Sequence, residues 1–188
     1  GTFDFSIPTN DTSPAIQGTV SGTLGSGEVV AIYRDGVYLG NATVVGGIWS
    51  FQDSGLMNGS YSYTAQVQDA AGNAGASSQA TLTVDTIAPA DPTTAPSGTD
   101  DQAPITGPIA AGSSTNDNTP LLSGTGTVGQ TITVYDGNTA LGTATVGSDG
   151  TWTFIPSPAL ADGPHSISYT TSDAAGNESS KVLMHLAN

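Results

Sequence analysis

The sequence predicts an all-β protein made of two β-sandwich domains in tandem, and three observations support this prediction. A five-residue motif, Asp-Ala-Ala-Gly-Asn, occurs at residues 69–73 and returns at 173–177, 104 residues later (173 − 69). Apolar and polar residues alternate through many short segments, as expected for strands with one buried face. Asp-Gly and Asn-Gly pairs separate these segments, and such pairs favour the tight turns of β-hairpins.

Other landmarks recur at nearly the same offset. Trp49-Ser50-Phe51 matches Trp152-Thr153-Phe154, and Gly18-Thr19 matches Gly124-Thr125. Self-similarity at a fixed period marks repeated structural modules. We therefore expect one repeat over residues 1–88 and a second over 89–188, arranged end to end, each the size of a small domain.

About seven short strands are expected in each repeat, which is typical of a β-sandwich. The clearest alternating segments are 60–67 and 81–84 in the first repeat, then 131–135, 151–154, 166–169 and 182–186 in the second. Trp49 and Trp152 lie within strands and are predicted to be core residues. Residues 86 to about 115 contain several prolines and are expected to run along the second sandwich as a broken first strand.

Charge excludes several classes of partner. The 188 residues include 16 acidic and only 2 basic side chains, a formal net charge of −14. Nucleic acid and anionic membrane surfaces are therefore not expected as partners, and no apolar run is long enough for membrane insertion. No signal peptide is expected within these residues. The absence of cysteine excludes disulfides. Metal cations or a salty medium are the candidates that would balance the charge, and the alternative is that the acidic residues simply keep a surface soluble.

The motifs resemble a known family. They are Val84-Asp85-Thr86-Ile87-Ala88-Pro89, Asp100-Asp101, residues 115–124, the Ala161-Asp162-Gly163 turn and the motif at 173–177. Together they resemble the bacterial immunoglobulin-like repeats of giant surface adhesins, the RTX-type and biofilm-associated proteins of Gram-negative bacteria. The resemblance covers essentially the whole chain and is weaker in the first repeat, which lacks the Asp-Asp segment.

The resemblance implies immunoglobulin-like sandwiches that are secreted to the bacterial cell surface. It also implies a structural role, in which the repeats extend an adhesin and project its distal adhesive domains. Neighbouring repeats of the same chain would be the partners, and contacts with a host, a surface or a biofilm would involve other domains of the parent protein. In such families calcium often rigidifies the domain junctions.

Fourteen of the sixteen acidic residues are Asp, and carboxylate and amide oxygens suit calcium. We expect the loop between the last two strands to lie at the end where the chain enters a sandwich, close to the start of its second strand. A junction site is thus predicted from Asp85, Asp100, Asp101, Asp117, Asp173 and Asn177, with an incomplete set at the free end of the first repeat, namely Asp4, Asp11, Asp69 and Asn73. The alternative is that the motif at 173–177 is only a turn.

The functional alternatives are of different classes. No nucleophile, phosphate-binding or zinc-binding motif is present, so we expect no enzyme. His165 and His185 are solitary and are expected to be surface or rim residues, which disfavours transition metals. The expected function is a calcium-stiffened spacer. The alternatives are a glycan- or protein-binding immunoglobulin-like module and, less favoured, homophilic contact between chains.

Overall fold

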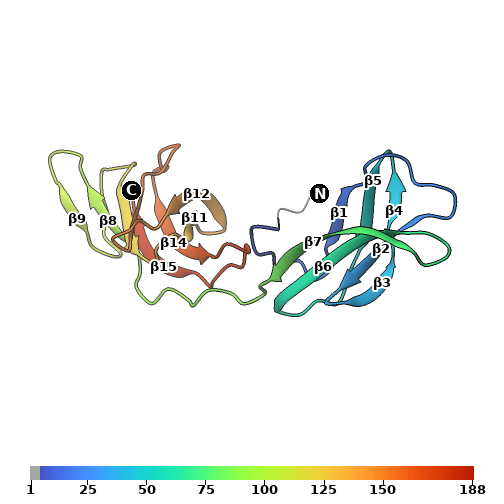
Figure 1. The fold of residues 1–188 in the computed structure, drawn as a ribbon. Helices are drawn as coiled ribbons and strands as arrows, with labels where there is room; N and C mark the ends of the chain where they lie inside the picture. Colours follow the sequence, from blue (N-terminus) through green and yellow to red (C-terminus); the bar gives the residue numbers. More distant parts are fainter. Residues whose placement is uncertain (1–4) are drawn as a thin grey trace. The chain divides into compact units, whose positions relative to one another are not determined.

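A computed structural model describes residues 5–188, and the chain divides into two compact units, Gly1–Ile87 and Ala88–Asn188 (Figure 1). Regular structure within residues 5–188 consists of strands alone. Each unit contains two antiparallel sheets that enclose one apolar core. The predicted all-β fold of two tandem sandwiches is confirmed.

Unit 1 contains a three-stranded sheet in the order β1-β5-β4 and a four-stranded sheet in the order β3-β2-β6-β7. Its strands are β1 (Ala15–Thr19), β2 (Val29–Arg34), β3 (Val37–Asn41), β4 (Thr43–Val45), β5 (Ile48–Gln52), β6 (Gly59–Gln68) and β7 (Ala74–Val84). The β2–β3 hairpin turns at Asp35 and Gly36, with φ of 52° and 81°. Positive φ at both residues is what a tight two-residue turn demands, and this explains the Asp-Gly pair.

Unit 2 contains two four-stranded sheets, in the orders β13-β10-β8-β9 and β12-β11-β14-β15. Its strands are β8 (Ser97–Asp100), β9 (Gly107–Ile109), β10 (Leu121–Thr125), β11 (Thr131–Asp136), β12 (Thr139–Thr145), β13 (Thr151–Phe154), β14 (Pro164–Ser172) and β15 (Val182–Ala187). The sheet that contains β11 and β14 repeats the strand order of the β2 and β6 sheet in unit 1.

The segment before β10 differs from the expected broken strand. β8 and β9 form an antiparallel hairpin, and β8 also pairs with β10, so that Leu121 lies opposite Thr99 and Ser123 opposite Ser97. Pro96 and Gly98 are buried on its inner side. The segment therefore supplies an additional edge to one sheet of unit 2.

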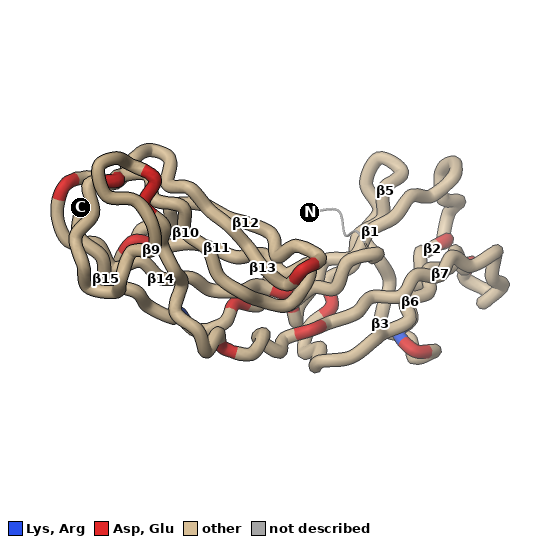
Figure 2. Tube along the Cα trace, turned by 90° about the vertical axis from the view of Figure 1, so that its left-hand side faces the viewer, with Lys and Arg blue, Asp and Glu red and all other residues tan. Residues whose placement is uncertain are grey.

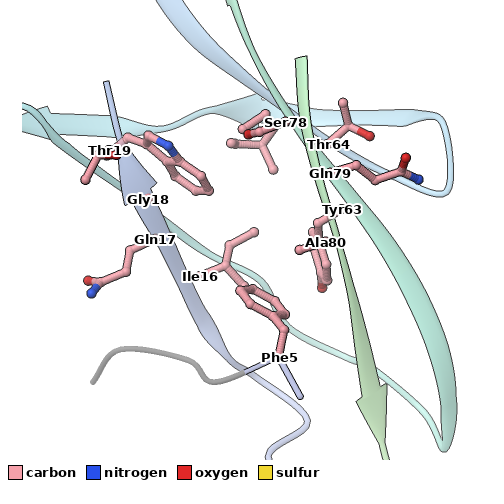
Figure 3. A pocket seen from close by; sticks show the side chains of 13 residues that line it. Phe5, Ile16, Gln17, Gly18, Thr19, Tyr63, Thr64, Ser78, Gln79 and Ala80 are labelled. Carbon is pink, nitrogen blue, oxygen red and sulfur yellow. The ribbon is translucent and has the colours of Figure 1, made fainter. Parts of the chain in front are cut away.

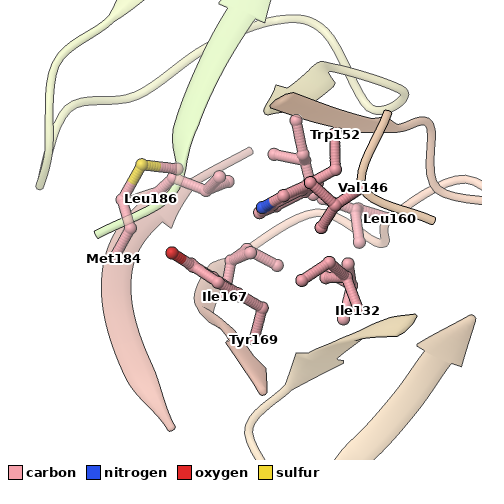
Figure 4. Packing of buried hydrophobic residues seen from close by; sticks show 10 residues of the cluster. Ile132, Val146, Trp152, Leu160, Ile167, Tyr169, Met184 and Leu186 are labelled. Carbon is pink, nitrogen blue, oxygen red and sulfur yellow. The ribbon is translucent and has the colours of Figure 1, made fainter. Parts of the chain in front are cut away.

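The two tryptophans occupy equivalent core positions, as predicted. Trp49 pairs with Gly18 across β1 and β5, and Trp152 pairs with Gly124 across β10 and β13. Their exposed fractions are 9% and 2%. In unit 2 the indole is tilted against the ring of Tyr169, with centroids 4.8 Å apart (Figure 4).

Candidate functional site

The repeated five-residue motif forms the same turn in both units. In unit 2 it follows β14, and one Asp173 oxygen accepts hydrogen bonds from the backbone N–H groups of Ala175 and Asn177, each at 2.9 Å. The side-chain amide of Asn177 donates to the other oxygen at 2.9 Å. Gly176 has φ of 89°. These bonds are those expected of a plain turn, and all of them form within the motif.

The turn of unit 1 has the same bonds. Asp69 accepts hydrogen bonds from the backbone N–H groups of Ala71 and Asn73, each at 2.9 Å, and from the Asn73 side chain at 2.8 Å. The bonds from Asn73 hold the pKa of Asp69 below its usual range because they favour the carboxylate. The identical motif thus has an identical local geometry in the two domains.

A second acidic group lies in unit 2 and includes two buried carboxylates. Asp100 is 5% exposed and Asp117 is 0% exposed. Thr115 connects them: its hydroxyl donates to Asp100 at 2.5 Å and accepts from the Asp117 backbone N–H at 3.1 Å. The Asp117 carboxylate accepts further bonds from the backbone N–H groups of Asp101 at 3.2 Å and Thr119 at 2.9 Å.

The two groups lie at opposite ends of unit 2, so the predicted convergence of Asp117 with Asp173 and Asn177 is wrong. Asn118 accepts a hydrogen bond from Leu160 at 2.8 Å, in the loop that leads into β14, whereas Asp173 follows the last residue of β14. The start of β11 pairs with the end of β14, and the chain reaches β11 directly from the end of β10. β10 and β14 therefore run in the same direction. Asp117, before β10, lies at the end where β14 starts.

Unit 1 has the same arrangement. Asp85 donates its backbone N–H to Thr9 at 2.8 Å, and Asp11 donates to the Thr9 hydroxyl at 3.1 Å. Both therefore lie where β7 ends, since Thr9 bridges Val84. Asp69 follows β6, whose first residue pairs with Val84, and so lies at the other end. Asp11 and Asp69 are not brought together, and Asp4 lies outside the described residues.

Within residues 5–188, no group of three or more His, Cys, Asp or Glu side chains is placed to hold a metal ion. Figure 2 shows the acidic positions spread over many loops of each unit. A cation at Asp100 and Asp117, or at Asp173, would take most of its ligands from carbonyls, hydroxyls, amides and water. Calcium accepts such ligands, whereas a zinc site needs nitrogen or sulfur donors that these groups lack.

A charged group that the sequence patterns did not predict is partly buried in unit 1. Arg34 Nη1 donates to both oxygens of Asp53, at 3.0 Å and 2.8 Å, and the Tyr63 hydroxyl donates to the same carboxylate at 2.5 Å. Asp53 is 7% exposed. Burial, together with the bond to Asp53, raises the pKa of Tyr63 above its ordinary value. The sequence feature that could have pointed to this group is that Arg34 is the only arginine in the sequence.

His165 also departs from expectation, because it is buried rather than on the surface or rim. Its Nδ1 lies 2.7 Å from an Asp136 carboxylate oxygen, and its Nε2 lies 2.7 Å from the Ala161 carbonyl. Burial acts to lower the pKa of His165, but the bonds to Asp136 and Ala161 and the charge of Asp136 outweigh it, so the pKa is raised. His185 is exposed, as expected. The Arg34–Asp53–Tyr63 group and the His165–Asp136 pair each form their bonds within one sandwich.

Comparison with known proteins identifies the domain type. A family model described as "Bacterial Ig-like domain" matches residues 6–86 and again 93–186. The chain matches no curated protein. Residues 5–188 form no helix that spans a membrane.

Among solved structures, the chain is similar to the fibronectin(III)-like modules of Clostridium thermocellum CbhA. Identity is 13%, the TM-score is 0.57, and the match covers 99% of this chain and 92% of that one. A biofilm associated protein (BSP domain) matches at 21% identity and a TM-score of 0.34, over 96% of this chain and only 28% of that one. The D00-D0 domain of intimin matches at 13% identity and a TM-score of 0.30, covering 97% and 98% of the two chains. At such identities the first match supports the fold alone.

Proposed function

The chain belongs to the bacterial Ig-like domain family, and from that premise we propose that its two domains are spacer repeats of a bacterial surface adhesin. The observation behind this proposal is that one module occurs twice, with the same Gly–Trp pairing in its core and the same Asp-Ala-Ala-Gly-Asn turn. The polar groups that differ between the units, around Asp53 and His165, are bonded inside a single sandwich. A module whose polar side chains bond within its own fold is suited to act as a spacer in a longer chain.

Surface location is part of this proposal. The domain family is bacterial, and each domain has its own apolar core without any cysteine in the sequence. A surplus of acidic over basic residues keeps such a chain soluble and well hydrated outside the cell. The adhesive contacts would then be made by other domains of the parent protein.

Surface display tests the spacer role. A binding domain of known target is displayed on bacteria through no copy, one copy or two copies of this chain, and attachment to target-coated beads is counted. A spacer increases attachment with copy number, and the chain without the binding domain confers none. Saturable attachment to glycan- or protein-coated beads by the chain alone would contradict the spacer role and favour a binding module.

We also propose that calcium binds to the group of Asp100, Asp101 and Asp117 in unit 2. Support comes from the two buried carboxylates, the nearby Thr115 hydroxyl and the net charge of −14. Calcium accepts carboxylate, hydroxyl and carbonyl oxygens in irregular geometry, and it would neutralise the carboxylates. Because ligand binding to the folded form raises stability, calcium should raise the melting temperature of unit 2.

Titration calorimetry and scanning calorimetry in calcium and in chelator test this proposal. Asp101→Asn is the informative variant because Asp101 is exposed and its side chain is not needed to bury the pair. Asp173→Asn is the matched control at the other end of the unit. If the heats and melting temperatures are the same in calcium and in chelator, neither the group of Asp100, Asp101 and Asp117 nor the Asp173 turn binds calcium. Both would then be structural turns only.

A further inference from the structure

The chain enters and leaves unit 2 at opposite ends of the sandwich. It enters beside Ser180, whose backbone N–H donates to Asp91 at 2.7 Å, at the end where β14 finishes. It reaches Asn188 at the end where β14 starts, and Asn188 exchanges two backbone hydrogen bonds with Gly163 there. Tension applied through the chain on both sides of unit 2 therefore pulls along the axes of its strands.

β8 is the first strand that such tension reaches. It runs antiparallel to β10 over three residue pairs, and Ser97, its first residue, lies at the end where the chain enters. Tension therefore pulls β8 lengthwise past β10. The hydrogen bonds of an antiparallel pair stand perpendicular to the strands, so this movement loads them together rather than one after another. β8 thus carries tension instead of fraying from its end.

Side chains hold the hairpin of β8 and β9 only weakly. The four residues of β8 include no apolar side chain, and β9 pairs with β8 alone within residues 5–188 (Figure 1). Ile109 of β9 is 9% exposed. A groove of about 510 Å³, bordered by Ile109 and Met184, lies between the hairpin and β15. Side chains that border a groove lose packing partners on that side, which weakens the attachment of the hairpin.

The next contact on the path of tension is stronger. Residues 112–115 run parallel to β15 and are joined to it by three backbone hydrogen bonds of 2.7–3.1 Å. Buried side chains support this contact on both sides: Pro120 and Leu122 follow the segment, and Met184 and Leu186 belong to β15. We therefore expect it to hold at a tension that detaches β8.

We propose that the hairpin of β8 and β9 is a reversible tension-release element, which slides off β10 before the rest of unit 2 unfolds and pairs again when tension falls. The proposal rests on the proposed spacer role, since a spacer carries tension. Release frees residues 92–111, twenty residues (111 − 91), and lengthens the chain by at most about 70 Å at about 3.5 Å per residue. The freed segment stays attached to the folded residues 112–188, and closure of so short a loop is fast and costs little entropy.

The test is extension of the 188-residue chain in optical tweezers, with handles at its two termini. Chelator is present throughout, so that calcium plays no part. A short step of at most about 70 Å should precede the long step in which residues 112–188 unfold, and it should reverse on relaxation. If unit 2 unfolds in one step with no short step before it, the proposal is wrong, whatever the display experiment shows about the spacer role.

A disulfide between β8 and β10 identifies the segment that moves. The side-chain oxygens of Ser97 and Ser123 lie 3.1 Å apart across these strands, so cysteines at both positions are close enough to bridge. The natural sequence contains no cysteine. The oxidised variant with Ser97→Cys and Ser123→Cys should lose the short step, and reduction should restore it. A short step that persists after oxidation would overturn the assignment to the hairpin.

The matched control places a disulfide in unit 1. Ser60 and Thr83 pair across β6 and β7, with side-chain oxygens 3.3 Å apart. Oxidation of the variant with Ser60→Cys and Thr83→Cys should shorten the unfolding step of unit 1, which reports that the bridge has formed, and should leave the short step of unit 2 unchanged.

Ile109→Ala tests whether the hairpin separates on its own. Loss of this apolar contact should lower the force of the short step and leave the force of the long step of unit 2 as in the natural chain. An equal fall in both forces would show that the hairpin and the sandwich unfold as one unit, which contradicts the proposal.

Discussion

The indole of Trp152 packs directly against Gly124, and a Cβ placed at Gly124 would lie 2.7 Å from the ring. The same relationship joins Trp49 to Gly18 in unit 1, again at 2.7 Å. The Gly-Thr and Trp-x-Phe landmarks of the two repeats are therefore two sides of one contact. A glycine is required on one strand so that the large ring on the next can lie flat across it.

Replacing either glycine should destabilise its own domain. Gly124→Ala and Gly18→Ala force the indole to move within a packed core, which should cost about 1–3 kcal/mol of unfolding free energy. Urea denaturation followed by tryptophan fluorescence measures this cost. Gly75→Ala is the matched control, because an added Cβ there lies no closer than 3.7 Å to its neighbours. An equal effect of all three substitutions would show that backbone freedom, not the indole contact, is responsible.

Replacing each tryptophan by alanine should lower the unfolding free energy of its domain, and by a larger amount in unit 2 than in unit 1. Trp152→Ala should cost about 3–5 kcal/mol, the usual range for a buried large aromatic. Trp49→Ala should cost less, because Trp49 is 9% exposed against 2% for Trp152 and lines a cavity of about 260 Å³ between β1 and β7 (Figure 3). Scanning calorimetry of each variant gives the two values. Acrylamide quenching of both indoles to the level of a free peptide would contradict their assignment to the core.

The unfolding free energy of unit 1 should fall more when the Asp53 carboxylate is removed than when the Tyr63 hydroxyl is removed. Asp53→Ala leaves Arg34 and the Tyr63 hydroxyl without this shared partner and should cost about 2 kcal/mol. Tyr63→Phe removes one hydrogen bond to the same carboxylate and should cost about 1 kcal/mol. Chemical denaturation compares the two. A larger loss for Tyr63→Phe than for Asp53→Ala would show that the hydroxyl has a more important partner than Asp53.

His165 should make the stability of unit 2 depend on pH. Its pKa in the folded domain is raised above the ordinary value, so the folded state binds the proton more tightly than the unfolded chain. This contribution is fully present below a pH of about 6.5, the ordinary histidine value, and is lost as pH rises through the folded pKa. The melting temperature of unit 2 should therefore fall between mildly acidic and mildly alkaline pH. His165→Gln should remove this pH dependence of the melting temperature, while His185→Gln, at an exposed position, should retain it.

Local patterns predicted most of the fold, because alternation, turn residues and repeated landmarks each act over a few residues. Asp35-Gly36 has the predicted turn geometry for this reason, and the motif at 173–177 has the turn geometry that was the alternative to a calcium-binding loop. Long-range relationships were harder to predict. The end of the sandwich at which Asp117 lies depends on β10 and β14 running in the same direction, and the hairpin of β8 and β9 depends on pairing with β10.

Burial of His165 also had no local signal, since its partner Asp136 is 29 residues away. The cavity beside Trp49 is lined by Ala65 and Ala80, which become informative only when the strand registers align them with the larger Tyr169 and Met184 of unit 2. Predicting such features requires knowledge of which strands are neighbours. A single sequence without that pairing supplies only the local pattern.

The ion pair of Arg34 with Asp53 affects how trypsin-like proteases can attack the folded chain. Trypsin-like proteases cleave after Lys or Arg, and the 188 residues offer them only Arg34 and Lys181. Arg34 ends a central strand, its guanidinium is bound by Asp53, and the peptide bond that follows it enters the tight Asp35-Gly36 hairpin turn rather than a long loop. Lys181 precedes β15, with its ammonium 3.8 Å from the Tyr135 ring centroid. Lys181 is thus the more exposed of the two basic residues, and cleavage after it would separate β15 from the other strands of unit 2.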